Sequence, residues 1–287
     1  MSDSTPLDER LIESGLLTRQ QLDEVRWSAR NSERSIWAEL VRSGLLNQEQ
    51  LACFFGAQLS VPYVDLSAYR LGLNLSQYVP EHLAREFLAA PLFEVEGTLY
   101  VAMANPLNLS ALDEIRRSSQ LDVEAVIASG RQVFSALDAI YGSPGPPLDA
   151  FSYYEGSVAP GSPQTRESTR VPFVNPATLE FTDHSIRLIT DGPVQAYTED
   201  LSAKGVSVRT AVFLPKGTPV KVTLDLAAQR DWGGPAPVCA MARVAHASRS
   251  FPAKDGSDPY VLGVEFLDLD SETAQALDRW VNARSQT

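Results

Sequence analysis

The sequence predicts an α+β protein of two domains, and three features of the chain support this. The N-terminal part contains a helical repeat, a stretch rich in Pro, Gly and Ser follows, and period-two alternation begins near residue 165. A chain of 287 residues is long enough for two hydrophobic cores. We expect a helical repeat plus a small α/β subdomain over 1–142, a linker over 143–164, and a six- to seven-stranded antiparallel β-barrel with a terminal helix over 165–287.

The helical repeat consists of two copies of one pattern. LIESGLLTRQQL at 11–22 recurs as LVRSGLLNQEQL at 40–51. In each copy a glycine, Gly15 or Gly44, stands where a helix end must turn left-handed, and a good N-cap residue follows three positions later. The pattern predicts a helix, a glycine turn and a second helix in each copy.

The rest of the N-terminal half alternates strands and helices. TLYVAMA and DVEAVIA are predicted strands, and residues 109–118 and 130–140 are predicted helices. This half contains SGLLxxxQL twice, VPYVDL, LYVAMANPLNLSALDEIR and AIYG. In these segments, residues 1–142 resemble the MshEN-like N-terminal domain of type II secretion and type IV pilus assembly ATPases. The resemblance implies a protein-interaction domain whose partner belongs to a pilus, secretion or motility complex.

Some members of that family bind cyclic di-GMP through a repeated RLGxxL…Q pattern. Here PLD at 6–8 and SIW at 35–37 stand where RLG is required, and the trailing glutamine is Ala29 in the first copy and Gln58 in the second. The residues typical of the fold are kept while those of the ligand site are lost. We therefore expect this half to bind protein and not nucleotide.

The C-terminal half is predicted to be the barrel. The preceding residues 143–164 hold 5 Pro, 3 Gly and 4 Ser, which is typical of an extended linker. Short β-rich segments separated by turn residues follow, and SETAQALDRWVNAR closes the sequence as a helix that in some such barrels makes oligomer contacts. The segments are TLEF, IRLIT, VQAYT, VSVRT, PVKVTLDL, VCAMARVAHA and YVLGVEF.

Two short motifs mark a candidate binding site. TRESTRVP contains Arg166 and Arg170, and EDLSAKG contains Asp200, Ser202 and Gly205. In this order they resemble RxxxR followed by [D/N]xSxxG, the signature of the PilZ domain, a small β-barrel that binds the bacterial second messenger cyclic di-GMP. The resemblance implies that these residues contact this ligand.

The chemistry of the ligand suits these residue types. A planar Arg fork pairs bidentately with phosphate oxygens or with guanine O6 and N7. Asp200 can accept from guanine N1–H and N2–H₂, Ser202 supplies a hydroxyl, and Gly205 allows a positive φ and lets the backbone approach the purine closely. If RxxxR lies in a flexible lead-in, the ligand can fold it onto the barrel.

Each motif alone also has a plain structural interpretation. Arg26, Arg30 and Arg34 share the RxxxR spacing on a predicted solvated helix face, and DxSxxG can form an Asx-type turn. The order of the motifs and their β-rich context favour the ligand site.

The charge composition limits the kinds of partner that the protein can bind. The net charge is −12, and residues 1–164 hold 11 basic and 21 acidic side chains. Such a surface is a poor partner for DNA, RNA or anionic membrane. The sequence has no apolar run of membrane-spanning length and no signal peptide at its start, so we expect a cytoplasmic protein with Cys53 and Cys239 as buried free thiols.

Residues for catalysis or metal binding do not form a pattern. His82, His184 and His246 are scattered without ligand spacing, and we interpret His246, within a strand, as structural. We expect no enzyme activity, no metal and no cofactor besides the ligand cyclic di-GMP.

Three functional hypotheses remain. The first is a cyclic di-GMP effector that senses the messenger through the barrel and regulates pilus, secretion or motility machinery through the N-terminal domain. The second is a ligand-independent adaptor of such an apparatus, and the third is a competitor of a full-length assembly ATPase for its partner. Retention of Arg166 and Arg170 favours the first, because many adaptors of this kind have lost these arginines.

The chain is expected to hydrolyse neither ATP nor GTP. No GxxxxGK[ST] phosphate loop occurs in the sequence, so nothing is available to hold a triphosphate and its metal. A phosphate-release assay on the purified chain should give the background rate. Turnover that disappears when a residue of this chain is replaced would contradict the expectation.

Overall fold

A computed structural model describes residues 6–59, 61–106, 108–142, 170–181, 186, 188–189, 192–229, 231–249 and 259–285. The chain divides into two compact units. One contains Met1–Leu66 and Leu71–Ser162, and the other contains Ser67–Arg70 and Pro163–Thr287.

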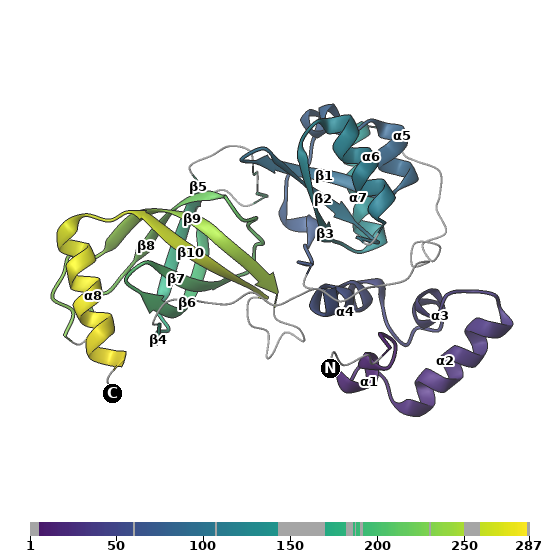
Figure 1. Cartoon of the computed structure of the whole chain (residues 1–287), viewed down its shortest axis with the longest axis horizontal. Helices are drawn as coiled ribbons and strands as arrows, with labels where there is room; N and C mark the ends of the chain where they lie inside the picture. The colour runs from purple at the N-terminus through teal and green to yellow at the C-terminus, as the bar shows by residue number, and fades with distance from the viewer. Residues whose placement is uncertain are drawn as a thin grey trace. The chain divides into compact units, whose positions relative to one another are not determined.

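The first unit begins with the predicted helical repeat, drawn in purple in Figure 1. Gly15 and Gly44 have φ values of 71° and 74°, which confirms the left-handed turns. Thr18 accepts a hydrogen bond from the backbone N–H of Gln21 and forms a capping box with it. The helices are α1 (Arg10–Glu13), α2 (Arg19–Asn31), α3 (Ile36–Arg42) and α4 (Gln48–Leu59).

An α/β subdomain follows. Strands β1 (Ala89–Val95), β2 (Thr98–Met103) and β3 (Asp122–Ile127) form a sheet in that order, with β2 antiparallel to β1 and parallel to β3. The sequence predicted β2 and β3 and missed β1. The helical elements are η1 (Leu66–Ala68), η2 (Leu73–Gln77), α5 (Glu81–Glu86), α6 (Leu109–Ser119) and α7 (Gly130–Tyr141), and α5 and α7 contact β1 while α6 contacts β3 (Figure 1).

The second unit is the predicted antiparallel barrel. Six strands close through pairing of β6 with β7, and the short β4 extends the edge beside β6. The strands are β4 (Val171–Pro172), β5 (Pro176–Phe181), β6 (Val194–Ser202), β7 (Gly205–Thr210), β8 (Pro219–Leu224), β9 (Val238–Arg249) and β10 (Tyr260–Asp268), in the order β4-β6-β5-β8-β9-β10-β7. In the predicted strand IRLIT, Leu188 forms one isolated bridge, and part of the segment lies outside the described residues.

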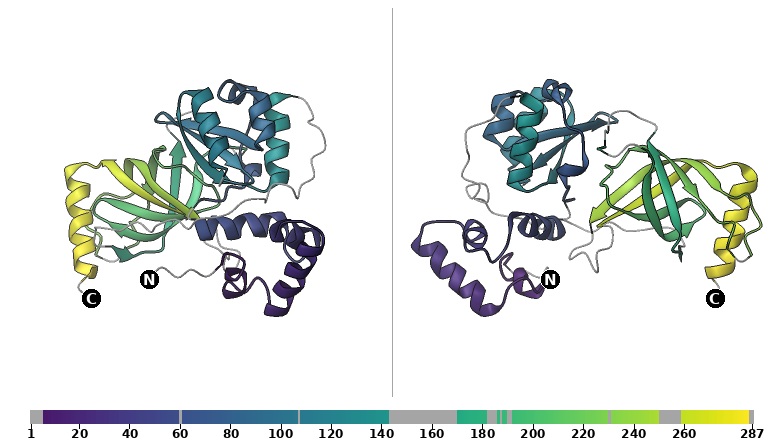
Figure 2. Two further views of the ribbon diagram at one scale, coloured as in Figure 1. Left: turned by 45° about the vertical axis from the view of Figure 1, so that its right-hand side comes forward. Right: turned by 180° about the vertical axis from the view of Figure 1, so that it is seen from behind.

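The terminal helix α8 (Ser271–Ser285) packs at one end of the barrel (Figure 2). Trp280 is 3% exposed, and its ring meets that of Phe173 edge-on at 5.2 Å between centroids. The apolar side chains of this helix, with Leu277, Trp280 and Val281 each at most 3% exposed, therefore pack into the core. Asp270 caps the helix by accepting from the backbone N–H of Thr273 at 2.9 Å.

The segment Ser67–Arg70 also belongs to the barrel unit. Tyr69 is buried, and its hydroxyl donates to the carbonyl oxygen of Phe213 at 2.5 Å. The backbone N–H of Ile189 donates to the carbonyl oxygen of Ala68 at 3.0 Å. The segment therefore completes the packing of this unit.

One cysteine prediction is wrong. Cys53 is buried as expected, but Cys239 is exposed. Strand β9 alternates here, with Val238 and Ala240 in the core, so the residue between them points outward. Within the described part of the chain, we find no helix long and apolar enough to cross a membrane.

A glycine is needed at position 205 because a side chain would not fit there, and not because of the backbone dihedral angle. Its φ is not positive, so the freedom of glycine to adopt a positive φ is not used at this position. It pairs with Glu265 of β10, and a Cβ atom at Gly205 would lie 2.2 Å from the carbonyl oxygen of Val264. The close approach of β7 and β10 leaves no room for a side chain.

Glu39 is a buried carboxylate in the first unit, with 1% of its surface exposed. Arg42 Nε donates to it at 2.8 Å and Ser28 Oγ at 2.7 Å. The hydrogen bond from Arg42 is the largest cause that lowers the pKa of Glu39 from 4.5 to about 2.

Glu39→Gln is expected to flatten the acid dependence of stability. Because the folded-state pKa is below the unfolded value, the carboxylate stabilises fully above about pH 4.5 and loses this effect as the pH falls towards 2. Melting temperatures across this range should therefore drop more steeply for the wild type than for Glu39→Gln. The exposed Glu13→Gln serves as control, and equal slopes for Glu39→Gln and the wild type would refute the role of Glu39.

Gly205→Ala is expected to destabilise the barrel by about 1–3 kcal/mol, because the added methyl group meets backbone atoms that cannot move alone. Denaturant unfolding measures this loss. Gly233→Ala is the matched control, since no atom lies within 4 Å of the position that a Cβ at Gly233 would take. A Gly205→Ala variant as stable as the wild type would contradict the close approach of β7 and β10.

Candidate ligand-binding site on the barrel

The two sequence motifs meet at the start of the barrel. Strand β4 pairs antiparallel with the end of β6, with Val171 opposite Leu201 and Pro172 opposite Asp200. This pairing holds Arg170 beside β6, and its Nη1 donates to Asp200 Oδ1 at 2.6 Å. Arg166 lies outside the described residues.

The ion pair is accessible from solvent. The side chains of Arg170 and Asp200 are 26% and 24% exposed. A partly exposed pair contributes modestly to stability, because water competes for both charges. Its main effect here is geometric, since it holds a guanidinium fork and a carboxylate next to each other at the surface.

A β-bulge directs Asp200 outward. The register of β6 against β7 skips Glu199, so Thr198 pairs with Val208 and Asp200 pairs with Ser207. Bulges of this kind turn a side chain to a new direction and are frequent next to binding sites. Glu199 itself forms an ion pair with Arg209 of β7.

Ser202 and Gly205 build the hairpin that carries Asp200. They are the last pair of the β6–β7 ladder, and Ser202 Oγ donates to the carbonyl oxygen of Gly205 at 2.9 Å. Ser202 is 2% exposed. In this structure the Ser202 hydroxyl therefore stabilises the turn. A contact between Ser202 and a ligand stays a prediction.

The degenerate motif in the first unit is occupied by internal ion pairs. Asp8 Oδ2 accepts from Arg26 Nε at 2.8 Å and from Nη2 at 2.6 Å, and Glu9 lies 2.9 Å from Arg26 Nη1. Gln58 accepts from Arg10 Nη1 at 3.0 Å. That this half does not bind the nucleotide stays a prediction.

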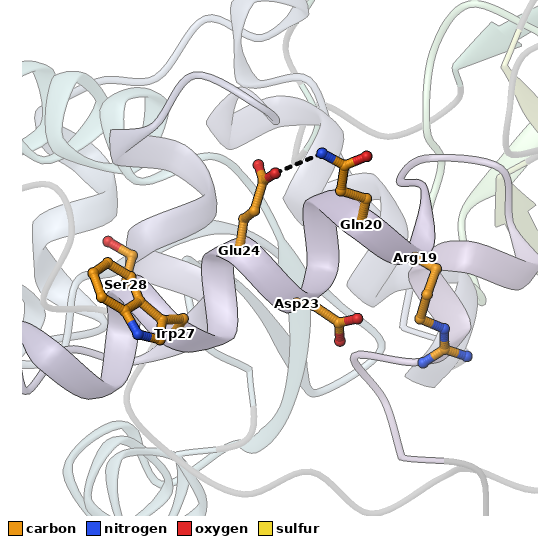
Figure 3. A pocket seen from close by; sticks show the side chains of 6 residues that line it. All are labelled: Arg19, Gln20, Asp23, Glu24, Trp27 and Ser28. Carbon is orange, nitrogen blue, oxygen red and sulfur yellow. Dashed lines mark hydrogen bonds between the residues drawn. The ribbon is translucent and has the colours of Figure 1, made fainter.

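A surface hollow of about 860 Å³ lies elsewhere, on α2 (Figure 3). Trp27 is 70% exposed there. A hollow lined by one helix has no opposing wall to enclose a ligand, and it contains none of the motif residues. The lining residues are Arg19, Gln20, Asp23, Glu24, Trp27 and Ser28.

Within the described ranges, no cluster of three or more His, Cys, Asp or Glu side chains is placed to hold a metal ion. The chemistry assembled at the barrel is instead that of charge-assisted hydrogen bonding. A guanidinium recognises phosphate or a purine edge, and a carboxylate recognises paired N–H donors.

Two family models match this chain, one in each half. The MshEN domain model matches residues 59–147, and the PilZ domain model matches residues 164–283. The type IV pilus assembly ATPase PilB of Myxococcus xanthus is 25% identical over 209 residues, which cover 69% of this chain and 36% of the relative. PilB of Thermus thermophilus is 30% identical over 146 residues, which cover 49% of this chain and 16% of the relative.

The chain thus spans about a third or less of the length of these relatives. Among solved structures, MshE with cdg is 29% identical, covers 47% of this chain and 97% of its own, and has a TM-score of 0.43. The PilZ domain with c-di-GMP of YcgR from Escherichia coli is 15% identical, covers 43% and 93%, and has a TM-score of 0.32. From the two family matches, this chain carries an MshEN domain followed by a PilZ domain.

Proposed function

We propose that this protein is a cyclic di-GMP effector whose PilZ barrel binds the messenger and whose N-terminal half acts on pilus, secretion or motility machinery in the cytoplasm. The observation that carries the proposal is the contact between Arg170 and Asp200. The two PilZ motifs are far apart in sequence, and β4 and β6 bring a residue of each to one surface point.

The proposed ligand complements both members of this pair. Its phosphodiesters and the O6 and N7 atoms of guanine are acceptors for a guanidinium, which carries five N–H donors in one plane. The guanine N1–H and N2–H₂ groups are donors for the Asp200 carboxylate. Binding then exchanges part of the ion pair for contacts of the same kind to the ligand, with Arg166 as the second proposed arginine.

The N-terminal half supplies the proposed link to an apparatus. The relatives that share this region are named as type IV pilus assembly ATPases. The sequence lacks the phosphate loop that hydrolysis requires. The domain therefore fits a role in docking on a protein partner without nucleotide hydrolysis. Asp8 and Glu9 are engaged in internal ion pairs, so we assign ligand sensing to the barrel.

Arg170→Ala and Asp200→Ala are each expected to weaken cyclic di-GMP binding by roughly tenfold to a hundredfold, because each removes a charge-assisted contact. Isothermal titration of the full chain measures the affinity, and a melting curve checks the fold. Arg166→Ala is expected to act in the same direction.

Lys221→Ala is the matched control for these variants. Lys221 also carries a positive charge on the outer face of the barrel, where it lies 3.6 Å from Glu180 on a different pair of strands. It should bind like the wild type. A wild-type chain that gives no heat of binding at millimolar cyclic di-GMP would end the receptor proposal in favour of the ligand-independent adaptor.

A further inference from the structure

Asp200 stands at one end of a row that crosses four strands. It pairs with Ser207 on β7, Ser207 pairs with Gly263 on β10, and Gly263 pairs with His246 on β9. Directly paired residues point to the same face of a sheet. The next row along these strands faces the core, since its members Leu201, Val206, Val264 and Val244 are at most 2% exposed. The row from Asp200 to His246 therefore faces outward.

Both ends of this row follow a β-bulge. The bulge at Glu199 precedes Asp200, and the register of β9 against β10 skips Ala245 directly before His246. A bulge changes the direction of the neighbouring side chain and occurs often at binding sites. The barrel thus sets Asp200 and His246 on the same face by the same device.

The imidazole of His246 lies over Gly263. A Cβ atom at Gly263 would lie 2.0 Å from His246 Cε1, 2.2 Å from Nδ1 and 2.9 Å from Nε2. The imidazole therefore covers the position where any other residue would place its side chain, and it remains half-exposed. Ser207, between the two ends, is 5% exposed. The two residues in the middle of the row, Ser207 and Gly263, are small and buried.

We propose that His246 is a further ligand-contacting residue, which stacks on a purine at the end of the row opposite Arg170 and Asp200. The inference rests on the proposed function and names a residue outside both PilZ motifs. Three steps between strands separate Asp200 from His246, a span of about 14 Å. A ligand with two purines on one phosphodiester ring presents one base edge to Asp200 and the face of its other base to the imidazole.

The residue types at the two ends of the row suit these two kinds of contact, one with a base edge and one with a base face. Proteins bind unstacked purines against flat aromatic or histidine side chains, and they recognise base edges with charged groups. The imidazole lies over Gly263 and is half-buried, so part of the ring is reachable from outside the barrel. The two residues between, Ser207 and Gly263, carry no bulky side chain.

A substitution pair separates stacking from simple packing over Gly263. His246→Phe keeps a flat aromatic ring, whereas His246→Leu fills similar space without an aromatic face. Isothermal titration of the full chain with cyclic di-GMP should show His246→Phe within about threefold of the wild type, and His246→Leu weaker by roughly fivefold to a hundredfold. Both variants should melt close to the wild-type temperature.

Ser248→Ala is the control, because Ser248 follows on the same strand and is also exposed. It should bind like the wild type. Unchanged affinity in His246→Leu, or equal losses in the two His246 variants, would overturn the stacking role while leaving the receptor function in place. Absence of binding by the wild type would instead remove the receptor function and this inference with it.

Discussion

Closure of the barrel through β6 is the constraint on which the site depends. Strand β6 pairs with β4 and β5 on one side and with β7 on the other. The pairing with β4 delivers Arg170 to Asp200, and the pairing with β7 sets the register that turns Asp200 outward. The ion pair is only partly buried, so its strength alone would not hold the two segments together. The backbone ladders and the core do that, and the pair orients its charges.

Two glycines show how tightly the outer face is built. Neither Gly205 nor Gly263 has a positive φ, and each is needed because another group occupies the space of a side chain. At Gly205 this group is the backbone of β10, and at Gly263 it is the imidazole of His246. The first contact brings β7 and β10 close together beside the hairpin, and the second places the imidazole in the same row as Asp200. One close-packed face thus serves both the fold and the proposed ligand.

The sequence predicted what depends on local pattern. The repeat, its left-handed glycines, the two domains and the barrel follow from periodicity and turn chemistry, and order within the chain pointed to Arg170 and Asp200. Features set by pairing between distant strands were missed. The position of His246 over Gly263 depends on the register of β9 and β10, which has no local signal in the sequence. Gly205 was assigned a backbone role because the approach of β10 has no local signal.

Hydrogen–deuterium exchange of the full chain with and without cyclic di-GMP tests the central claim most directly, because it locates the ligand without altering a residue. The account predicts added protection in β6 and β7, where Asp200 and the hairpin lie, and in the part of β9 that contains His246. Helices α1 to α4 should exchange at the same rate with and without ligand. Protection confined to those helices, or no change in the barrel at saturating ligand, would contradict it.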